Sequence, residues 1–155
     1  MGESRVVVGL DGCDACQAAL RYAIGEARRR GCELVVVAAY ERGRSVYRLT
    51  GYVVSAELDP AGDARAMALR CLQLAGIGTS PDGPAWNIVT KEMLPADALA
   101  AAAEGAHMVV VGRHHGEIPS EKKHVGSTTT LLLRHSPVPV VSVHSSYQPE
   151  QHRSG

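Results

Sequence analysis

The chain has 155 residues, of which 45% are hydrophobic, and this size and composition predict one compact domain with its own core. Its 16 basic and 16 acidic residues cancel, which argues against a nucleic-acid-binding protein and against attraction to anionic lipid. No apolar run reaches the roughly 18 residues of a membrane span, and the first five residues lead into a strand and not a signal peptide. We therefore expect a cytoplasmic protein, with its domain at residues 1–147, a flexible tail at 148–155 and its four cysteines as free thiols.

The first predicted element is a strand at residues 5–10, a continuous apolar run rich in β-branched residues. A turn at residues 11–14 precedes a helix with apolar residues at intervals of three and four, and Gly31 is a typical helix stop. The later elements, in chain order, are a strand at 34–39, a polar stretch at 41–60, a helix at 61–75, a strand at 86–91, a helix at 95–104, a strand at 108–111, a helix at 127–135 and a strand at 137–143. This alternation predicts an α/β fold, a five-stranded parallel doubly wound sheet with helices on both faces.

Three polar or glycine-rich segments follow strands of this predicted sheet, at residues 11–13, 38–41 and 112–127. In such sheets, ligands bind beyond the carboxyl ends of the strands, where the winding direction reverses. Glycines there let backbone N–H groups approach phosphate oxygens, and the start of the helix at residue 127 adds unpaired donors. The same residues also have ordinary roles, because glycines end strands and serines cap helices in many proteins. No P-loop and no dinucleotide fingerprint occurs.

Four segments match, in the same order, motifs of one known family. Residues 6–12 read V-V-V-G-L-D-G, residues 94–99 read L-P-A-D-A-L, and residues 106–112 read A-H-M-V-V-V-G. The ending, G-S at 126–127 followed by L-R-H-S-P-V-P-V-V at 133–141, is the most specific of the four. Over residues 5–144 the chain resembles the universal stress protein family. The resemblance implies a Rossmann-like fold similar to that of the adenine nucleotide alpha hydrolases.

The ATP-binding members of that family carry the motif G-x2-G-x9-G-[ST]. Its second half fits the nine residues between Gly116 and Gly126, but three residues instead of two separate Gly112 from Gly116, as if one histidine were inserted. This insertion could form a harmless bulge, or it could move His115 into the phosphate space. Carried over by position, Asp11 would hold the ribose or a phosphate-bound metal, and Ala39 would touch the adenine. The other nucleotide-binding candidates, on the phosphate side, are Gly112, His114, Gly116, Gly126, Ser127 and Thr128.

A C-x-x-C pair, Cys13 and Cys16, lies at the start of the first predicted helix. A helix N-terminus lowers a thiol pKa, which is the physical basis of redox C-x-x-C sites. The ordinary interpretation is that Cys13 takes the place of a small N-cap residue and Cys16 is a buried thiol. Redox sensing and metal binding remain alternatives, the latter if His114 or His115 approached to complete a tetrahedral zinc site. Spacing alone does not make this a zinc site, and no residue is assigned to metal binding.

The resemblance implies a regulatory protein that binds ATP with magnesium and has a role in stress tolerance. We assign no catalytic residue and expect at most slow ATP hydrolysis. The last strand, from Val138 to Val143, should lie at a sheet edge, and its pairing with a second copy would give a homodimer. We expect no nucleic-acid or membrane partner. Two alternatives stay open, which are a dimeric interaction module without a nucleotide and a thiol or metal sensor that uses Cys13 and Cys16.

Overall fold

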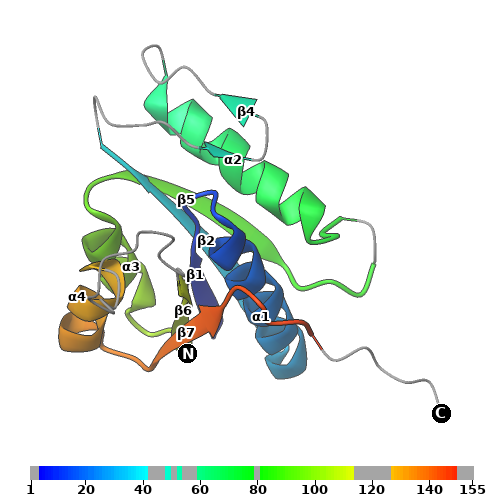
Figure 1. Ribbon diagram of the computed structural model, residues 1–155. Coiled ribbons are helices and arrows are strands. Elements are labelled where there is room, and N and C mark those ends of the chain that lie inside the picture. Colours follow the sequence, from blue (N-terminus) through cyan, green and yellow to red (C-terminus); the bar gives the residue numbers. More distant parts are fainter. Residues whose placement is uncertain are drawn as a thin grey trace.

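The computed structural model describes residues 4–41, 48–49, 52–53, 59–78, 81–113 and 127–149. Its main sheet has five strands in the order β5-β2-β1-β6-β7, and every pairing within it is parallel (Figure 1). The strands are β1 (Arg5–Gly9), β2 (Glu33–Tyr40), β5 (Trp86–Glu92), β6 (Met108–Arg113) and β7 (Val140–His144). The chain moves outward from β1 to β2 and β5, then returns to the other side of β1 for β6 and β7. The predicted parallel, doubly wound sheet is thus confirmed.

Helices cover both faces of the sheet, as predicted (Figure 1). The helices α1 (Asp14–Arg30) and α2 (Pro60–Leu74) pack on one face, and α3 (Pro95–Ala103) and α4 (Ser127–His135) on the other. Successive side chains of a strand point to opposite faces, so Val6 and Val8 join the core beneath α1 and α2, whereas Val7 joins the core beneath α3. Among the described helices, none is long and apolar enough to cross a membrane.

Two short segments differ from the predicted elements. The polar stretch at residues 41–60 contains an antiparallel pair, β3 (Arg48–Leu49) and β4 (Tyr52–Val53), which is too short to show an alternating pattern in the sequence. The last strand begins at Val140, three residues later than predicted, because Pro137 and Pro139 have no N–H to donate to a ladder. Past this strand, Tyr147 still belongs to the fold, since its ring packs edge-on against Tyr22 of α1 at 5.5 Å between centroids.

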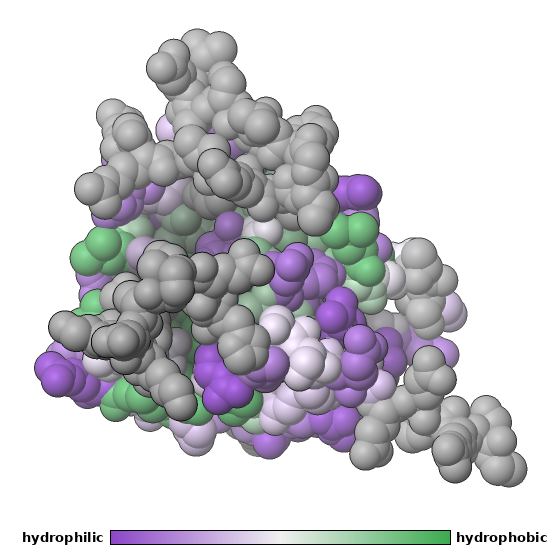
Figure 2. Space-filling view, viewed as in Figure 1, coloured by the Kyte–Doolittle hydropathy of each residue, from purple (hydrophilic) through white to green (hydrophobic). Residues whose placement is uncertain are grey.

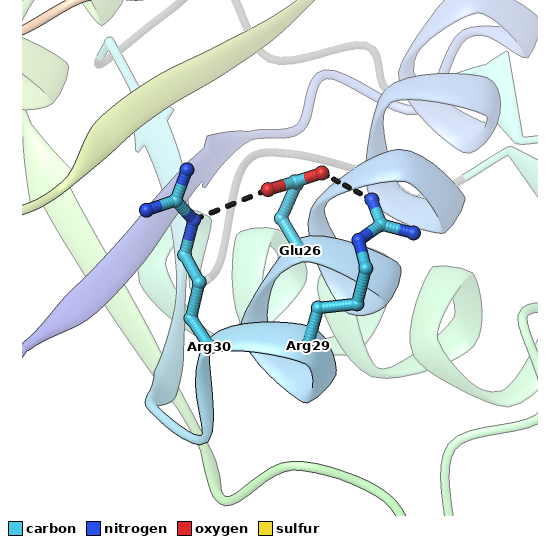
Figure 3. Close-up of polar contacts among 3 residues, drawn as sticks. All are labelled: Glu26, Arg29 and Arg30. Atoms are coloured by element: carbon cyan, nitrogen blue, oxygen red, sulfur yellow. Dashed lines mark hydrogen bonds and ion pairs between the residues drawn. The ribbon is translucent and has the colours of Figure 1, made fainter.

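The first helix has well-defined ends. Cys13 is its N-cap, and its Sγ accepts a hydrogen bond from the Cys16 N–H at 3.3 Å. Gly31 ends it in the left-handed conformation, with φ of 62°, which confirms the predicted helix stop. In the last turns, the Glu26 carboxylate pairs with both Arg29 and Arg30 (Figure 3). The N-cap sets where the first turn of α1 begins after β1.

Candidate functional site

A cavity of about 300 Å³ lies at the carboxyl ends of β1, β2, β6 and β7, beside the first turns of α1, α3 and α4. The chain winds in opposite directions on the two sides of β1, so this cavity occupies the switch point at which ligands bind in open α/β sheets. Its volume is at the lower end of the range of small-molecule sites. The sequence predicted a site at this edge of the sheet, and the structure has a hollow there.

The cavity brings together four of the residues that the sequence marked for nucleotide binding. Asp11 follows β1, Ala39 lies in β2, Gly112 lies in β6 and Thr128 lies in the first turn of α4, and all four line the hollow. Ser127 is the first residue of α4, next to Thr128. The remaining candidates, His114, Gly116 and Gly126, lie outside the described residues, as does His115.

Several lining residues were not marked in the sequence. Thr129 is buried in α4 and Ser142 is exposed in β7, and both line the cavity. Their signals were weak, namely a run of threonines at a helix start and one serine that interrupts the valines of the last strand. Leu99 of α3 adds an apolar wall together with Val37 and Val111. Such contacts across the sheet depend on the strand order and on helix placement, which a linear pattern does not contain.

The cavity has an apolar wall and two charged lining residues. Among its described lining residues, the charged ones are Asp11 at the end of β1 and Arg113 at the end of β6. The start of α4 adds the hydroxyl-bearing Thr128 and the positive end of a helix dipole. This arrangement can hold a flat apolar ring against the wall, a polyol near the carboxylate and an anion near the helix start. The described lining contains no second carboxylate that could form a general acid–base pair with Asp11.

The packing of β6 against α1 requires a glycine at position 112. A Cβ at this position would lie 2.5 Å from the carbonyl carbon of Ala15 and 2.7 Å from the backbone nitrogen of Cys16. Real Cβ atoms do not approach backbone atoms so closely, so only glycine lets β6 pack this tightly against the first turn of α1. The sequence predicted this glycine for close approach to a phosphate, and the structure shows a close approach to a helix.

The cysteine pair adjoins the cavity. Cys16 is buried and lines it, and Cys13 is half-buried, so the interpretation of an N-cap and a buried thiol is confirmed. Asp11 Oδ1 accepts the Cys13 N–H at 3.0 Å and the Cys16 thiol at 2.8 Å. The hydrogen bond with Cys13, burial and the charge of Asp11 raise the pKa of the Cys16 thiol well above its usual range. For Cys16 these effects outweigh the lowering that a helix N-terminus alone would give.

Comparison with known proteins places the chain among relatives of the same fold. The model of the universal stress protein family matches residues 3–144. A universal stress protein of Mycobacterium tuberculosis is 33% identical over 141 residues, which are 91% of this chain and 45% of that protein. The chain thus spans about half the length of the curated relatives it matches.

Solved structures of that family show the same fold. A universal stress protein in complex with cAMP has a TM-score of 0.66 at 21% identity, with 94% of this chain and 100% of that chain covered. One from Archaeoglobus fulgidus in complex with dAMP has a TM-score of 0.62 at 21% identity, with 92% and 99% covered. Both similarities extend over almost the whole length of the compared chains.

Proposed function

The chain belongs to the universal stress protein family, and we propose that it binds an adenine nucleotide in the cavity at the carboxyl ends of the strands. One observation carries this proposal: the fold gathers Asp11, Ala39, Gly112 and Thr128 around a single hollow, although they come from three different elements and the turn after β1. Two structures of the same fold hold adenine nucleotides, cAMP in one and dAMP in the other. The role that fits these features is regulatory binding, with at most slow hydrolysis of ATP.

The lining suggests how the nucleotide would lie. The adenine would rest against the apolar wall near Ala39 and Leu99, and its ribose hydroxyls would approach the Asp11 carboxylate. The phosphates would extend toward Arg113 and the N-terminus of α4, where the positive charge and the helix dipole favour anions. Mg²⁺ prefers oxygen ligands, and the Asp11 carboxylate would hold a phosphate-bound Mg²⁺ as the alternative to the ribose.

The decisive measurement is thermal unfolding of the purified protein with and without millimolar ATP and magnesium. A ligand that binds only the folded state stabilises it by about 2.7 kcal/mol at 100 times its Kd. We expect a clear rise in the melting temperature with ATP.

A matched pair of variants locates the effect. Ala39→Leu adds bulk where the adenine would lie, whereas Ala101→Leu adds the same bulk on the exposed side of α3. The first should lose the ATP-dependent rise, and the second should keep it. No rise at saturating ATP in the unaltered protein would overturn the proposal and favour the interaction module that binds no nucleotide.

We also propose that the protein forms a homodimer through β7. This strand lies at the edge of the sheet, since the described strands leave it paired with β6 alone. Next to it, α4 exposes Leu131 and Leu133 at 40% and 65% of their surface. Figure 2 shows hydrophobic residues on the lower left, the side on which α3 and α4 lie in Figure 1. An open strand edge beside an apolar helix surface is suited to a second copy of the chain.

A further inference from the structure

Three potential metal ligands converge where β1 leads into α1. A carboxylate oxygen of Asp11 and the Sγ atoms of Cys13 and Cys16 all lie within 4.8 Å of one another. The spacing of the two cysteines in the sequence did not reveal the third member, because Asp11 reaches the pair only through the turn at the start of the helix. Two sulfurs and one carboxylate oxygen form a donor set that is typical of zinc and not of magnesium.

The separations suit a tetrahedral ion. Zinc lies about 2.3 Å from sulfur and about 2.0–2.2 Å from a carboxylate oxygen, so its ligand atoms are about 3.4–3.8 Å apart. The three atoms already lie within 4.8 Å, and Cys16 Sγ is 2.8 Å from Asp11 Oδ1. Side-chain rotations that move the ligand atoms by about 1 Å would therefore place all three around one ion. The Cys16 proton that now points to Asp11 would be replaced by the metal, and both thiol protons would pass to solvent.

The backbone that carries these ligands is held in place on two sides. The Cys13 N–H donates to Asp11, and the Cys16 N–H donates to Cys13, which sets the turn before the helix. Because Gly112 has no side chain, β6 packs directly on the backbone of Ala15 and Cys16 in the first turn of α1. Ligands carried on a rigid turn bind a metal with little loss of conformational freedom.

We propose that Asp11, Cys13 and Cys16 form a site for a divalent ion of the zinc class, with its fourth coordination position open toward the cavity. The opening follows from the lining, since both Asp11 and Cys16 border the hollow. The site itself does not rest on nucleotide binding. One consequence does rest on the proposed function. An ion bound to Asp11 would leave this carboxylate unable to bind the ribose or Mg²⁺, so zinc and the nucleotide would compete.

The test is a titration of the reduced, metal-free protein with Co²⁺ in the presence of a phosphine reductant. Two thiolate ligands should give an intense near-ultraviolet charge-transfer absorption and the visible bands of a tetrahedral cobalt ion, saturating at one equivalent. Zinc should then displace the cobalt and remove these bands. Absence of the charge-transfer absorption would overturn the proposal.

Single substitutions assign the ligands. Cys16→Ser and Asp11→Asn should each weaken Co²⁺ binding at least tenfold, and so should Cys13→Ser, which keeps an oxygen able to cap α1. The matched control is Cys32→Ser. Cys32 is also a buried free thiol, but it directly precedes the N-terminal end of β2, at the edge of the sheet opposite to the three ligands. Its spectrum should stay unchanged. Equal binding by Asp11→Asn and the unaltered protein would contradict the three-ligand site, and loss of the bands in Cys32→Ser would contradict its location.

The ATP and cobalt titrations of the unaltered protein separate this inference from the proposed function. If the protein shows no response to ATP but gives the cobalt spectrum, the nucleotide proposal fails and the metal site stands. If ATP stabilises the protein and the cobalt spectrum is absent, the metal-site proposal fails and the nucleotide proposal stands.

Discussion

At the scale of single residues, the surroundings decide what a glycine does. Gly112 stands where a Cβ would collide with the backbone of Ala15 and Cys16, and the neighbouring backbone cannot rotate away as a side chain could. Gly25 lies inside α1, and a Cβ there would meet only the guanidinium of Arg29, at 3.7 Å. The sequence marked Gly112 through a family motif, but it could not show that the nearest neighbour is a helix.

This contrast gives the first prediction. Gly112→Ala should destabilise the protein by about 1–3 kcal/mol, since the new methyl group forces β6 and α1 apart. Gly25→Ala should leave stability unchanged or raise it by about 0.5–1 kcal/mol, because alanine is the better helix former. Urea unfolding at one pH measures both. Equal stability of Gly112→Ala and the unaltered protein would mean that the two elements do not pack as closely as described here.

At the scale of elements, α1 is the part of the chain that connects the features discussed above. Its N-terminal turn carries Cys13 and Cys16, and its C-terminal turns carry an ion cluster in which Glu26 pairs with Arg29 and Arg30 (Figure 3). The hydrogen bond from Arg29 in particular lowers the pKa of the Glu26 carboxyl. The arginine side chains are 63% and 41% exposed, so solvent weakens these pairs and their contribution is small.

The second prediction concerns pH. A carboxyl whose pKa is lower in the folded state stabilises the fold above its unfolded pKa, near 4.3 for glutamate, and this contribution is lost as the pH falls through the folded value. Glu26→Gln should therefore cost up to about 1 kcal/mol at pH 7 and less at pH 3. Chemical unfolding at the two pH values measures the difference. In a background that carries Arg29→Ala and Arg30→Ala, Glu26→Gln should have little effect at either pH.

At the scale of the whole molecule, the strand order decides which surfaces stay open. The Val109 N–H donates to the Pro139 carbonyl at 3.0 Å, so alternate residues from Pro139 onward bond to β6. The backbone groups of Val140 and Ser142, which lie between them, then point to the outer edge of the sheet. A sequence can mark an edge strand through its prolines, but only the assembled sheet shows which backbone groups face outward.

The third prediction follows from this edge. Ser142→Pro removes an outward N–H of β7 that strand pairing between copies would need, whereas Gln148→Pro makes the same change beyond the strand. If the proposed dimer forms through β7, the first change should raise its dissociation constant at least tenfold, a cost of about 1.4 kcal/mol, and the second should not. Analytical ultracentrifugation measures both. A monomer at micromolar concentration in the unaltered chain would contradict the dimer.

The order and type of the main elements were determined by the sequence alone. Hydrophobic runs and intervals of three and four are local properties, so the five long strands and four helices were placed within a few residues, as at Gly31, where the helix stops. The two-residue strands at Arg48–Leu49 and Tyr52–Val53 were missed because a pattern needs more residues than they contain. The family resemblance likewise marked Asp11 and Ala39 as candidates before any cavity was known, and both line the cavity.

What only the tertiary structure decided is which distant residues meet. The hollow at the strand ends needs the order β5-β2-β1-β6-β7, which brings Asp11, Ala39, Gly112 and Thr128 around it. This is not a property of a local pattern, because it depends on how elements pack once their apolar faces are buried. The sequence of a segment determines whether it forms a helix or a strand, whereas contacts between segments depend on the sheet that they form together.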